Sequence, residues 1–188
     1  TVPCRGPFMY RHLVLVLGTI VLLALTDVVQ AQTVHAGDPP SIVAALQSAG
    51  YKAELTKDDS GDPLVSSASS GTEFSVYFFG CEKGRDCTSV QFYAGYKTDK
   101  PLPFELINEW NASKRFAKAY ISKTGGGRIE LDVNLDPGGI SRALFVDTLA
   151  VWVRAMAAFE THIGRYRSET ARQSHLDPPA SSLAPRTS

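Results

Sequence analysis

The sequence predicts an α+β domain in which helices pack on one face of a mainly antiparallel sheet. Segments with alternating apolar and polar residues come in pairs joined by short turns, a pattern typical of antiparallel hairpins. Other segments carry apolar residues at helical spacing instead. Because helices and strands are grouped along the chain and do not alternate one by one, the order favours the α+β class over a parallel sheet.

The first half of the expected domain contains one helix and four strands. Residues 40–49 have apolar side chains at helical spacing, with Pro39 before them and Gly50 after them, as helix ends prefer. Clusters of Asp, Ser and Gly mark the turns that follow. Strands are expected over residues 52–56, 64–68, 72–80 and 88–96. The last two are rich in aromatic and β-branched residues, so they should form the centre of the sheet.

The second half contains two helices around another hairpin. We expect a helix over residues 104–115 and strands over 117–121 and 128–136, with a glycine-rich turn between the strands. The longest helix should run from Ser141 to about Tyr166, and its charged residues argue against a membrane span. Its expected apolar stripe is Leu144, Leu149, Trp152, Met156, Phe159 and Ile163.

The two ends of the chain differ in composition from the domain, which we place at residues 39–166. Met9 to His12 form a short basic start, residues 13–25 are almost wholly apolar, and Val29-Gln30-Ala31 is a small-residue processing site. This order predicts a signal peptide within residues 1–31, cleaved after Ala31, and hence a periplasmic or secreted protein. The alternative is an uncleaved membrane anchor. Residues 167–188 predict a disordered tail.

The cysteine count agrees with export. Cys81 and Cys87 are the only pair after the expected cleavage site, and they flank the turn between two expected strands. In an oxidising compartment such a pair predicts a disulfide across the hairpin. A redox or zinc site is the alternative, but the spacing is longer than Cys-x-x-Cys and no histidine lies nearby.

Composition limits the classes of partner. The chain has 188 residues, of which 44% are hydrophobic and 20% charged, as expected for one globular domain. Its 19 basic residues balance 19 acidic ones, so no basic surface for nucleic acid or an anionic membrane is expected.

Several runs of residues resemble the YbjN family. These are Ile42 to Tyr51, Leu106 to Asn111, Lys114 to Tyr120, Leu131 to Leu135 and Gly138 to Ser141. The resemblance implies a regulator of bacterial sensory transduction, with a fold similar to the small α+β chaperones of type III secretion. It implies no catalytic residues. The signal peptide and the cysteine pair are more typical of an exported branch of the family.

Candidate chemical sites elsewhere are weak. Asp58, Ser60 and Asp62 begin like a calcium loop, but Pro63 replaces the required glycine, which favours a hairpin turn. Glu130, Asp132, Asn134 and Asp136 share one strand face, which is read as solvated; a cation site or a partner surface is the alternative. His162 is the one histidine within the domain, and we interpret it as a packing or surface residue rather than a catalytic one. No catalytic residue, metal or cofactor is predicted.

The second helix carries the most specific motif. Asn108 and Asn111 lie one turn apart and are expected to bond neighbouring backbone groups, while Trp110 should face the sheet. The structural interpretation is a core tryptophan with polar caps. The functional one is a peptide-binding groove lined by Trp110, Tyr120 and Trp152.

Three functional hypotheses follow. The favoured one is a non-catalytic protein-binding, chaperone-like or regulatory module of the bacterial cell envelope, whose partner is a protein or peptide, or a second copy in a homodimer. The alternative is a small-molecule sensor with an aromatic-lined pocket. An enzyme would require titratable groups that converge in a cleft, and the sequence shows no such cluster.

Overall fold

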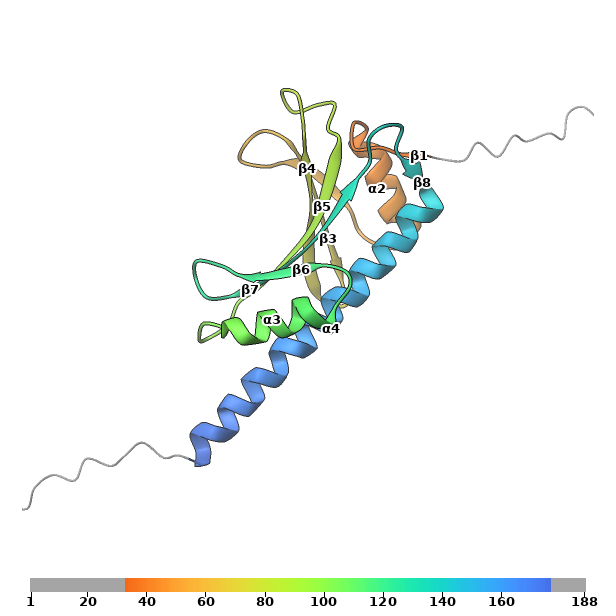
Figure 1. Cartoon of the computed structure of the whole chain (residues 1–188). Helices are drawn as coiled ribbons and strands as arrows, with labels where there is room; N and C mark the ends of the chain where they lie inside the picture. The colour runs from red at the N-terminus through yellow and green to blue at the C-terminus, as the bar shows by residue number, and fades with distance from the viewer. Residues whose placement is uncertain (1–32, 177–188) are drawn as a thin grey trace, which may run out of the picture. The chain divides into compact units, whose positions relative to one another are not determined.

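The computed structural model describes residues 33–176, with side chains placed from Thr33 to Gly164. The predicted signal peptide and residues 177–188 of the predicted tail lie outside this range. The helices are α2 (Pro39–Ser48), α3 (Phe104–Ser113) and α4 (Arg142–Leu176) (Figure 1). The strands are β1 (Thr33–Val34), β2 (Glu54–Lys57), β3 (Pro63–Ser69), β4 (Thr72–Phe79), β5 (Ser89–Tyr96), β6 (Lys118–Ile121), β7 (Gly127–Asn134) and β8 (Ile140–Ser141).

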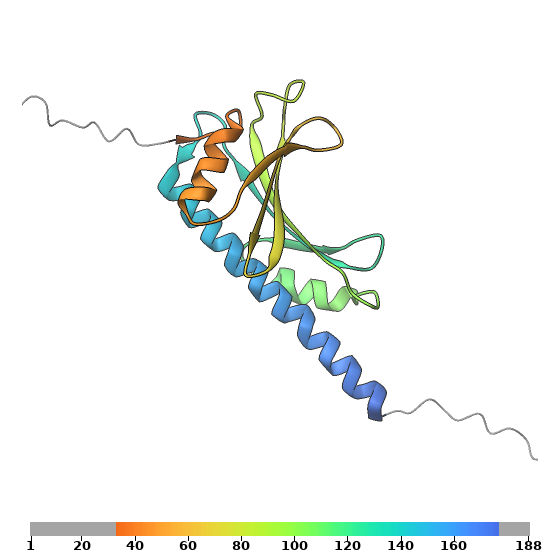
Figure 2. The ribbon, with the colours of Figure 1, turned by 180° about the vertical axis from the view of Figure 1, so that it is seen from behind.

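A six-stranded sheet forms the centre of the domain. Its strand order is β2-β3-β4-β5-β7-β6, and every neighbouring pair is antiparallel (Figure 2). The sequence predicted all six strands of this sheet, and each predicted end lies within two residues of the observed one. β5 and β7 pair over their whole lengths, from Ser89 opposite Asn134 to Tyr96 opposite Gly127. The predicted α+β class with a mainly antiparallel sheet is therefore confirmed.

A second, two-stranded sheet was not predicted. β1 pairs with β8 antiparallel, so that Thr33 lies opposite Ser141 and Val34 opposite Ile140. Two residues are too few to show the alternation from which a strand is recognised. The Ser141 hydroxyl also accepts a hydrogen bond from the Leu144 N–H at 3.2 Å, so this short strand leads directly into the cap of α4.

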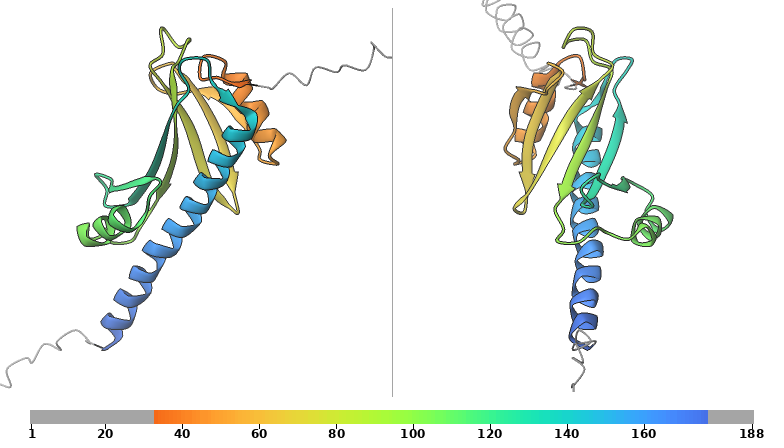
Figure 3. Two further views of the ribbon diagram at one scale, coloured as in Figure 1. Left: turned by 45° about the vertical axis from the view of Figure 1, so that its right-hand side comes forward. Right: turned by 90° about the vertical axis from the view of Figure 1, so that its left-hand side faces the viewer.

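α2 and α4 pack on the same face of the sheet (Figure 3). The face of α4 that meets the sheet consists of Phe145, Leu149, Trp152, Met156, Phe159 and Ile163, all at most 4% exposed. Aromatic rings fill the interface, where the Trp152 ring stacks on Phe92 with centroids 5.7 Å apart and meets Phe74 edge to face at 6.2 Å. The predicted stripe was wrong at one position, because Phe145 is buried and Leu144 is 53% exposed. One helical position turns a side chain by about 100°, which carries Leu144 off the stripe.

α4 is longer than predicted. It continues to Leu176, past the expected end near Tyr166, so the predicted disordered tail is helical over its first part. The sequence explains the difference, because residues 165–176 contain neither glycine nor proline and Pro178-Pro179 follow. The average composition of residues 167–188 conceals this stretch, because the prolines and serines that dominate the average lie mostly beyond Leu176. In the described part of the chain, no helix combines the length and apolar character needed to cross a membrane.

The predicted disulfide is present between Cys81 and Cys87, whose Cα atoms are 3.9 Å apart. The two cysteines follow the last paired residues of β4 and precede β5, where the Thr88 N–H donates to the Phe79 carbonyl at 3.0 Å. The bond therefore closes the loop at the end of the central hairpin.

Candidate functional site

The face of the sheet opposite α4 carries polar and aromatic side chains, and we call it the outer face. Strand register assigns to it Ser75, Tyr77, Phe79, Ser89, Gln91, Tyr93, Lys118, Tyr120, Glu130 and Asp132. Their neighbours along each strand point to the core, as Phe92 and Ile129 do, both 0% exposed. Among the described residues, α2 and α4 lie on the other side of the sheet (Figure 3). The outer face is thus the broad surface that these helices leave open.

Three tyrosines dominate the middle of the outer face. The rings of Tyr77 and Tyr93, on β4 and β5, meet edge to face with centroids 5.6 Å apart. Tyr120 lies on β6 and is 41% exposed. Burial raises the pKa of Tyr77, and the nearby Tyr93 and Asp58 raise it further. All three tyrosines present rigid rings with polar tips.

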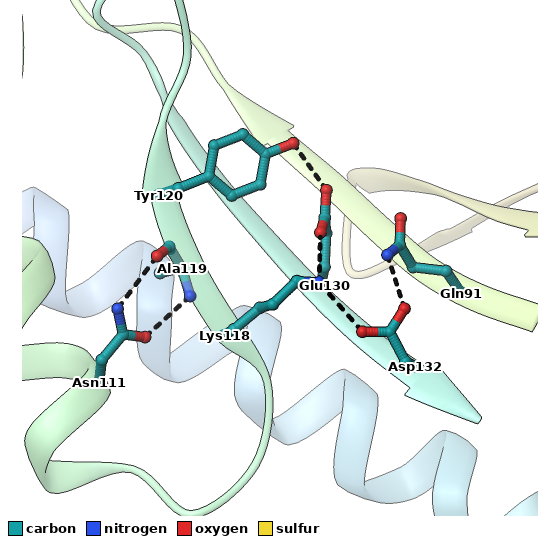
Figure 4. A network of polar contacts seen from close by, with 7 residues as sticks. All are labelled: Gln91, Asn111, Lys118, Ala119, Tyr120, Glu130 and Asp132. Carbon is teal, nitrogen blue, oxygen red and sulfur yellow. Dashed lines mark hydrogen bonds and ion pairs between the residues drawn. The ribbon is translucent and has the colours of Figure 1, made fainter. Parts of the chain in front are cut away.

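A polar network joins Tyr120 to the neighbouring strands (Figure 4). The Tyr120 hydroxyl donates to Glu130 Oε1 at 2.6 Å, and Lys118 Nζ lies 3.2 Å from Glu130 Oε2. The same ammonium bonds Asp132 Oδ2 at 3.1 Å. Gln91 then donates to Asp132 Oδ1 at 2.7 Å, so β5, β6 and β7 are linked. The network fixes the positions of these side chains on the outer face.

The pKa values of Lys118 and Tyr120 reflect this network. The hydrogen bond to Asp132 contributes most to raising the pKa of Lys118, and Glu130 adds to it. Burial is the main cause that raises the pKa of Tyr120, followed by the hydrogen bond to Glu130. Both shifts favour the protonated forms, so the network keeps its charges and donors throughout the neutral range.

The structure corrects the interpretation of the acidic strand face. Glu130 was read as one of four solvated residues, but it is only 9% exposed, beneath Tyr120 and Lys118. Asp132 and Asn134 remain exposed. Among the described residues, no group of three or more acidic, histidine or cysteine side chains is arranged to hold a metal ion. Glu130 instead accepts bonds from a phenol and an ammonium.

Asn111 binds the backbone of the edge strand β6, whereas the sequence predicted that both Asn108 and Asn111 would bond the connection next to α3. Its Nδ2 donates to the Ala119 carbonyl at 3.1 Å, and its Oδ1 accepts from the Ala119 N–H at 2.9 Å (Figure 4). The amide thus pairs with β6 as the next strand would, which blocks this edge of the sheet. Asn108 is exposed on the same helix and makes no such contact.

Trp110 and Trp152 lie in the core, and Tyr120 lies on the outer face, so the three side chains do not form a common groove. Trp110 is 1% exposed, donates from Nε1 to the Ala117 carbonyl at 2.9 Å, and packs edge to face against Phe159 at 5.0 Å. The strand alternation places Tyr120 opposite Arg128 and away from α4. The structural interpretation of Trp110 is therefore the one that its contacts support.

The remaining candidates also have structural roles. Asp58 Oδ1 accepts hydrogen bonds from the Ser60 and Asp62 N–H groups at 2.9 and 3.0 Å, which makes the supposed calcium loop an Asx-type turn. His162 Nε2 lies 2.8 Å from the Leu106 carbonyl, and its ring lies 5.7 Å from that of Trp110. It joins α4 to α3.

Sequence reasoning missed Tyr77, Gln91, Tyr93 and Lys118. The sequence did contain a signal for Tyr93, although its strand looks wholly apolar. Val90, Phe92 and Ala94 share one face of this strand, so Tyr93 falls on the opposite, more polar face. The pairing of Lys118 with two carboxylates required the register between β6 and β7.

Two comparisons with known proteins bear on identity. No curated protein matches the chain significantly. The YbjN family, described as "Putative bacterial sensory transduction regulator", matches residues 38–165, which is more than half of the chain. The runs that resembled this family lie on α2, α3 and β6 to β8 and on the segments next to them. The chain belongs to the YbjN family.

Proposed function

We propose that this protein is a non-catalytic regulatory module that binds a protein partner through the outer face of its sheet. The observation that carries the proposal is the distribution of side chains across the sheet. α2 and α4 cover one face, whereas the other presents Tyr77, Tyr93 and Tyr120 around a fixed polar network.

Tyrosines suit such a surface for a physical reason. A tyrosine ring offers a large contact area, loses little conformational entropy on binding and still has a hydroxyl for hydrogen bonding. Tyrosine is therefore enriched among residues that dominate protein interfaces. Because Glu130 and Lys118 are already paired, their side chains lose little further freedom when a partner binds.

The shape of the surface favours a protein over a small ligand. A small molecule is bound by enclosing most of its surface in a pocket. The aromatic rings that could have lined one, Trp110 and Trp152, instead pack against Phe159 and Phe92 in the core. A sheet face suits a partner that covers it broadly, as the predicted chaperone-like role requires.

The cell envelope is the proposed location. The Cys81–Cys87 disulfide supports an oxidising compartment. The basic start, apolar run and processing site within residues 9–31 support export. A regulator of sensory transduction at this location would act on envelope proteins.

Quantitative co-purification tests the proposal. Tagged wild-type protein, a Tyr93→Ser variant and an Asp147→Ser variant are expressed in the same bacterium, and bound proteins are quantified by mass spectrometry. Asp147 is exposed on α4, on the opposite side of the domain, and serves as the matched control. A specific partner should be retained by the wild type and the control and depleted by Tyr93→Ser. Equal retention by all three folded proteins would refute the proposal.

A further inference from the structure

A hollow between the end of α3 and the middle of α4 lies apart from the outer face. It measures about 340 Å³ and opens at the surface. Val151, Ala155 and Ala158 of α4 form its floor, and Phe116, 49% exposed, forms one side. We call it the α3–α4 groove. At this size it would hold one or two apolar side chains of a larger ligand.

The rim of the α3–α4 groove is positively charged. Lys114, Arg115 and Arg154 line it, and no acidic residue does. Within the described part of the chain, none of the three cations has a carboxylate at ion-pair distance, whereas Lys118 has two. Because the whole chain has a net charge of zero, this excess of cations is local to the groove.

Packing explains only part of this arrangement. Lys114 and Arg115 follow the last turn of α3, where cations stabilise a helix end. Lys114 Nζ lies 5.6 Å from the centroid of the Trp110 ring, and Arg115 Cζ lies 5.3 Å from that of the Phe116 ring. Arg154 lies in the middle of α4, where no helix end needs it. Its position on the same rim adds a third cation that the end of α3 does not explain.

The backbone holds the exposed side of the groove in place. Ala117 follows Phe116 and has a φ of 64°, in the left-handed region that is unfavourable for alanine. The Trp110 Nε1–H···O bond to the Ala117 carbonyl fixes this bend at 2.9 Å. Phe116 thus stays half exposed at the rim although its burial would be favourable.

We propose that the α3–α4 groove binds an acidic peptide segment, with one apolar side chain of the peptide on the floor and carboxylates on Lys114, Arg115 and Arg154. The complementarity of charge selects an anionic partner. The concave apolar floor selects one that inserts a side chain, whereas a membrane surface would meet protruding residues. This site is independent of the outer face.

Binding of defined peptides tests this proposal. The probe is a fluorescent synthetic peptide with one phenylalanine flanked by aspartates and glutamates. One control peptide replaces the phenylalanine with glycine, and another replaces the acids with their amides. Anisotropy with purified wild-type protein should show binding of the first peptide only, weakened by added salt.

Variants locate the site. Arg154→Glu should weaken binding ~10-fold or more, because it removes one charge-assisted contact and adds a repulsion. Phe116→Ser should also weaken peptide binding, because it removes an apolar side of the groove. Lys123→Glu is the matched control, since Lys123 is an exposed cation in the turn before β7, and it should bind as the wild type does. Tyr93→Ser should also leave peptide binding unchanged, which separates this site from the outer face.

Three results would overturn the proposal. The first is equal binding of the acidic and amide peptides. The second is binding that Lys123→Glu weakens as much as Arg154→Glu does. The third is absence of peptide binding to the folded wild-type protein. An Arg154-dependent association with phosphatidylglycerol vesicles, measured by co-sedimentation, or with a second copy of the chain, measured by analytical ultracentrifugation, would then identify another occupant of the groove.

Discussion

At the scale of single residues, the Asn111 side chain makes the hydrogen bonds that a neighbouring strand would make. Its amide satisfies both the N–H and the carbonyl of Ala119 on the edge strand β6. An unpaired edge would otherwise offer these groups to another chain. The opposite edge, β2, has no such cap, but it is only four residues long and carries Glu54 and Lys57, which discourage edge pairing.

Replacing Asn111 with alanine should destabilise the fold by about 2 kcal/mol, because two hydrogen bonds are lost and the backbone of Ala119 loses its partner. Asn108→Ala on the same helix is the control, and it should change the free energy of unfolding by less than ~0.5 kcal/mol. Both variants gain the same helix propensity, so their difference isolates the two bonds. Chemical denaturation measures it. Equal stabilities of the two variants would show that the edge contact contributes nothing.

Tyr120 should make stability fall in alkaline solution. Its pKa in the folded protein is raised above the value of about 10 expected for an unfolded chain. Its contribution is therefore complete below about pH 10 and is lost as the pH rises through the folded pKa. In Tyr120→Phe the free energy of unfolding should decline less steeply above pH 10, although Lys118, whose pKa is also raised, still contributes. Unfolding curves over this range, compared with wild type, give the slopes. An unchanged slope would mean that Tyr120 ionises normally.

At the scale of elements, the sequence predicted well whatever depends on local pattern. The hairpins β4–β5 and β6–β7, the helices α2 and α3 and the start of α4 were expected close to their observed positions, because alternation and helical spacing recur over many residues there. The sheet formed by β1 and β8 could not be expected, since each strand has two residues. The end of α4 was missed because average composition concealed a stretch free of glycine and proline.

The candidate site was harder to predict than the fold for a related reason. Asn111 was identified from its motif, but the grouping of Trp110, Tyr120 and Trp152 combined side chains from two sides of the sheet. Aromatic residues look alike in a sequence whether they face the core or the solvent. Only the register between strands assigns Tyr93 and Tyr120 to the outer face and pairs Glu130 with Lys118.

The disulfide should stabilise the central hairpin. Closing a loop as short as Cys81 to Cys87 is worth about 2 kcal/mol by the chain-entropy argument. A Cys81→Ser/Cys87→Ser variant should therefore unfold at a lower temperature than oxidised wild type, as measured by calorimetry. Adding reductant should lower the unfolding temperature of the wild type toward that of the variant and leave the unfolding temperature of the variant unchanged. If reductant lowered the unfolding temperatures of both proteins equally, the effect would not come from this bond.

At the scale of the whole molecule, one sheet separates two tasks. Its inner face supplies the stability, with α4 burying six side chains along its stripe against aromatic rings of β4 and β5. Its outer face displays Tyr77, Tyr93 and Tyr120 with the polar groups between them already paired, and we propose that it serves recognition. Under this proposal, one face of the sheet stabilises the domain and the other binds the partner.

Site-specific crosslinking in living bacteria tests this claim most directly. A photoreactive amino acid is placed at Gln91 on the outer face or at Gln47 on the exposed side of α2, and adducts are resolved by size and identified by mass spectrometry. The account predicts a discrete heterologous adduct from Gln91 that is lost when Tyr93→Ser is added, and none from Gln47. An adduct from Gln47 alone, or no adduct from either position in a correctly folded protein, would contradict it.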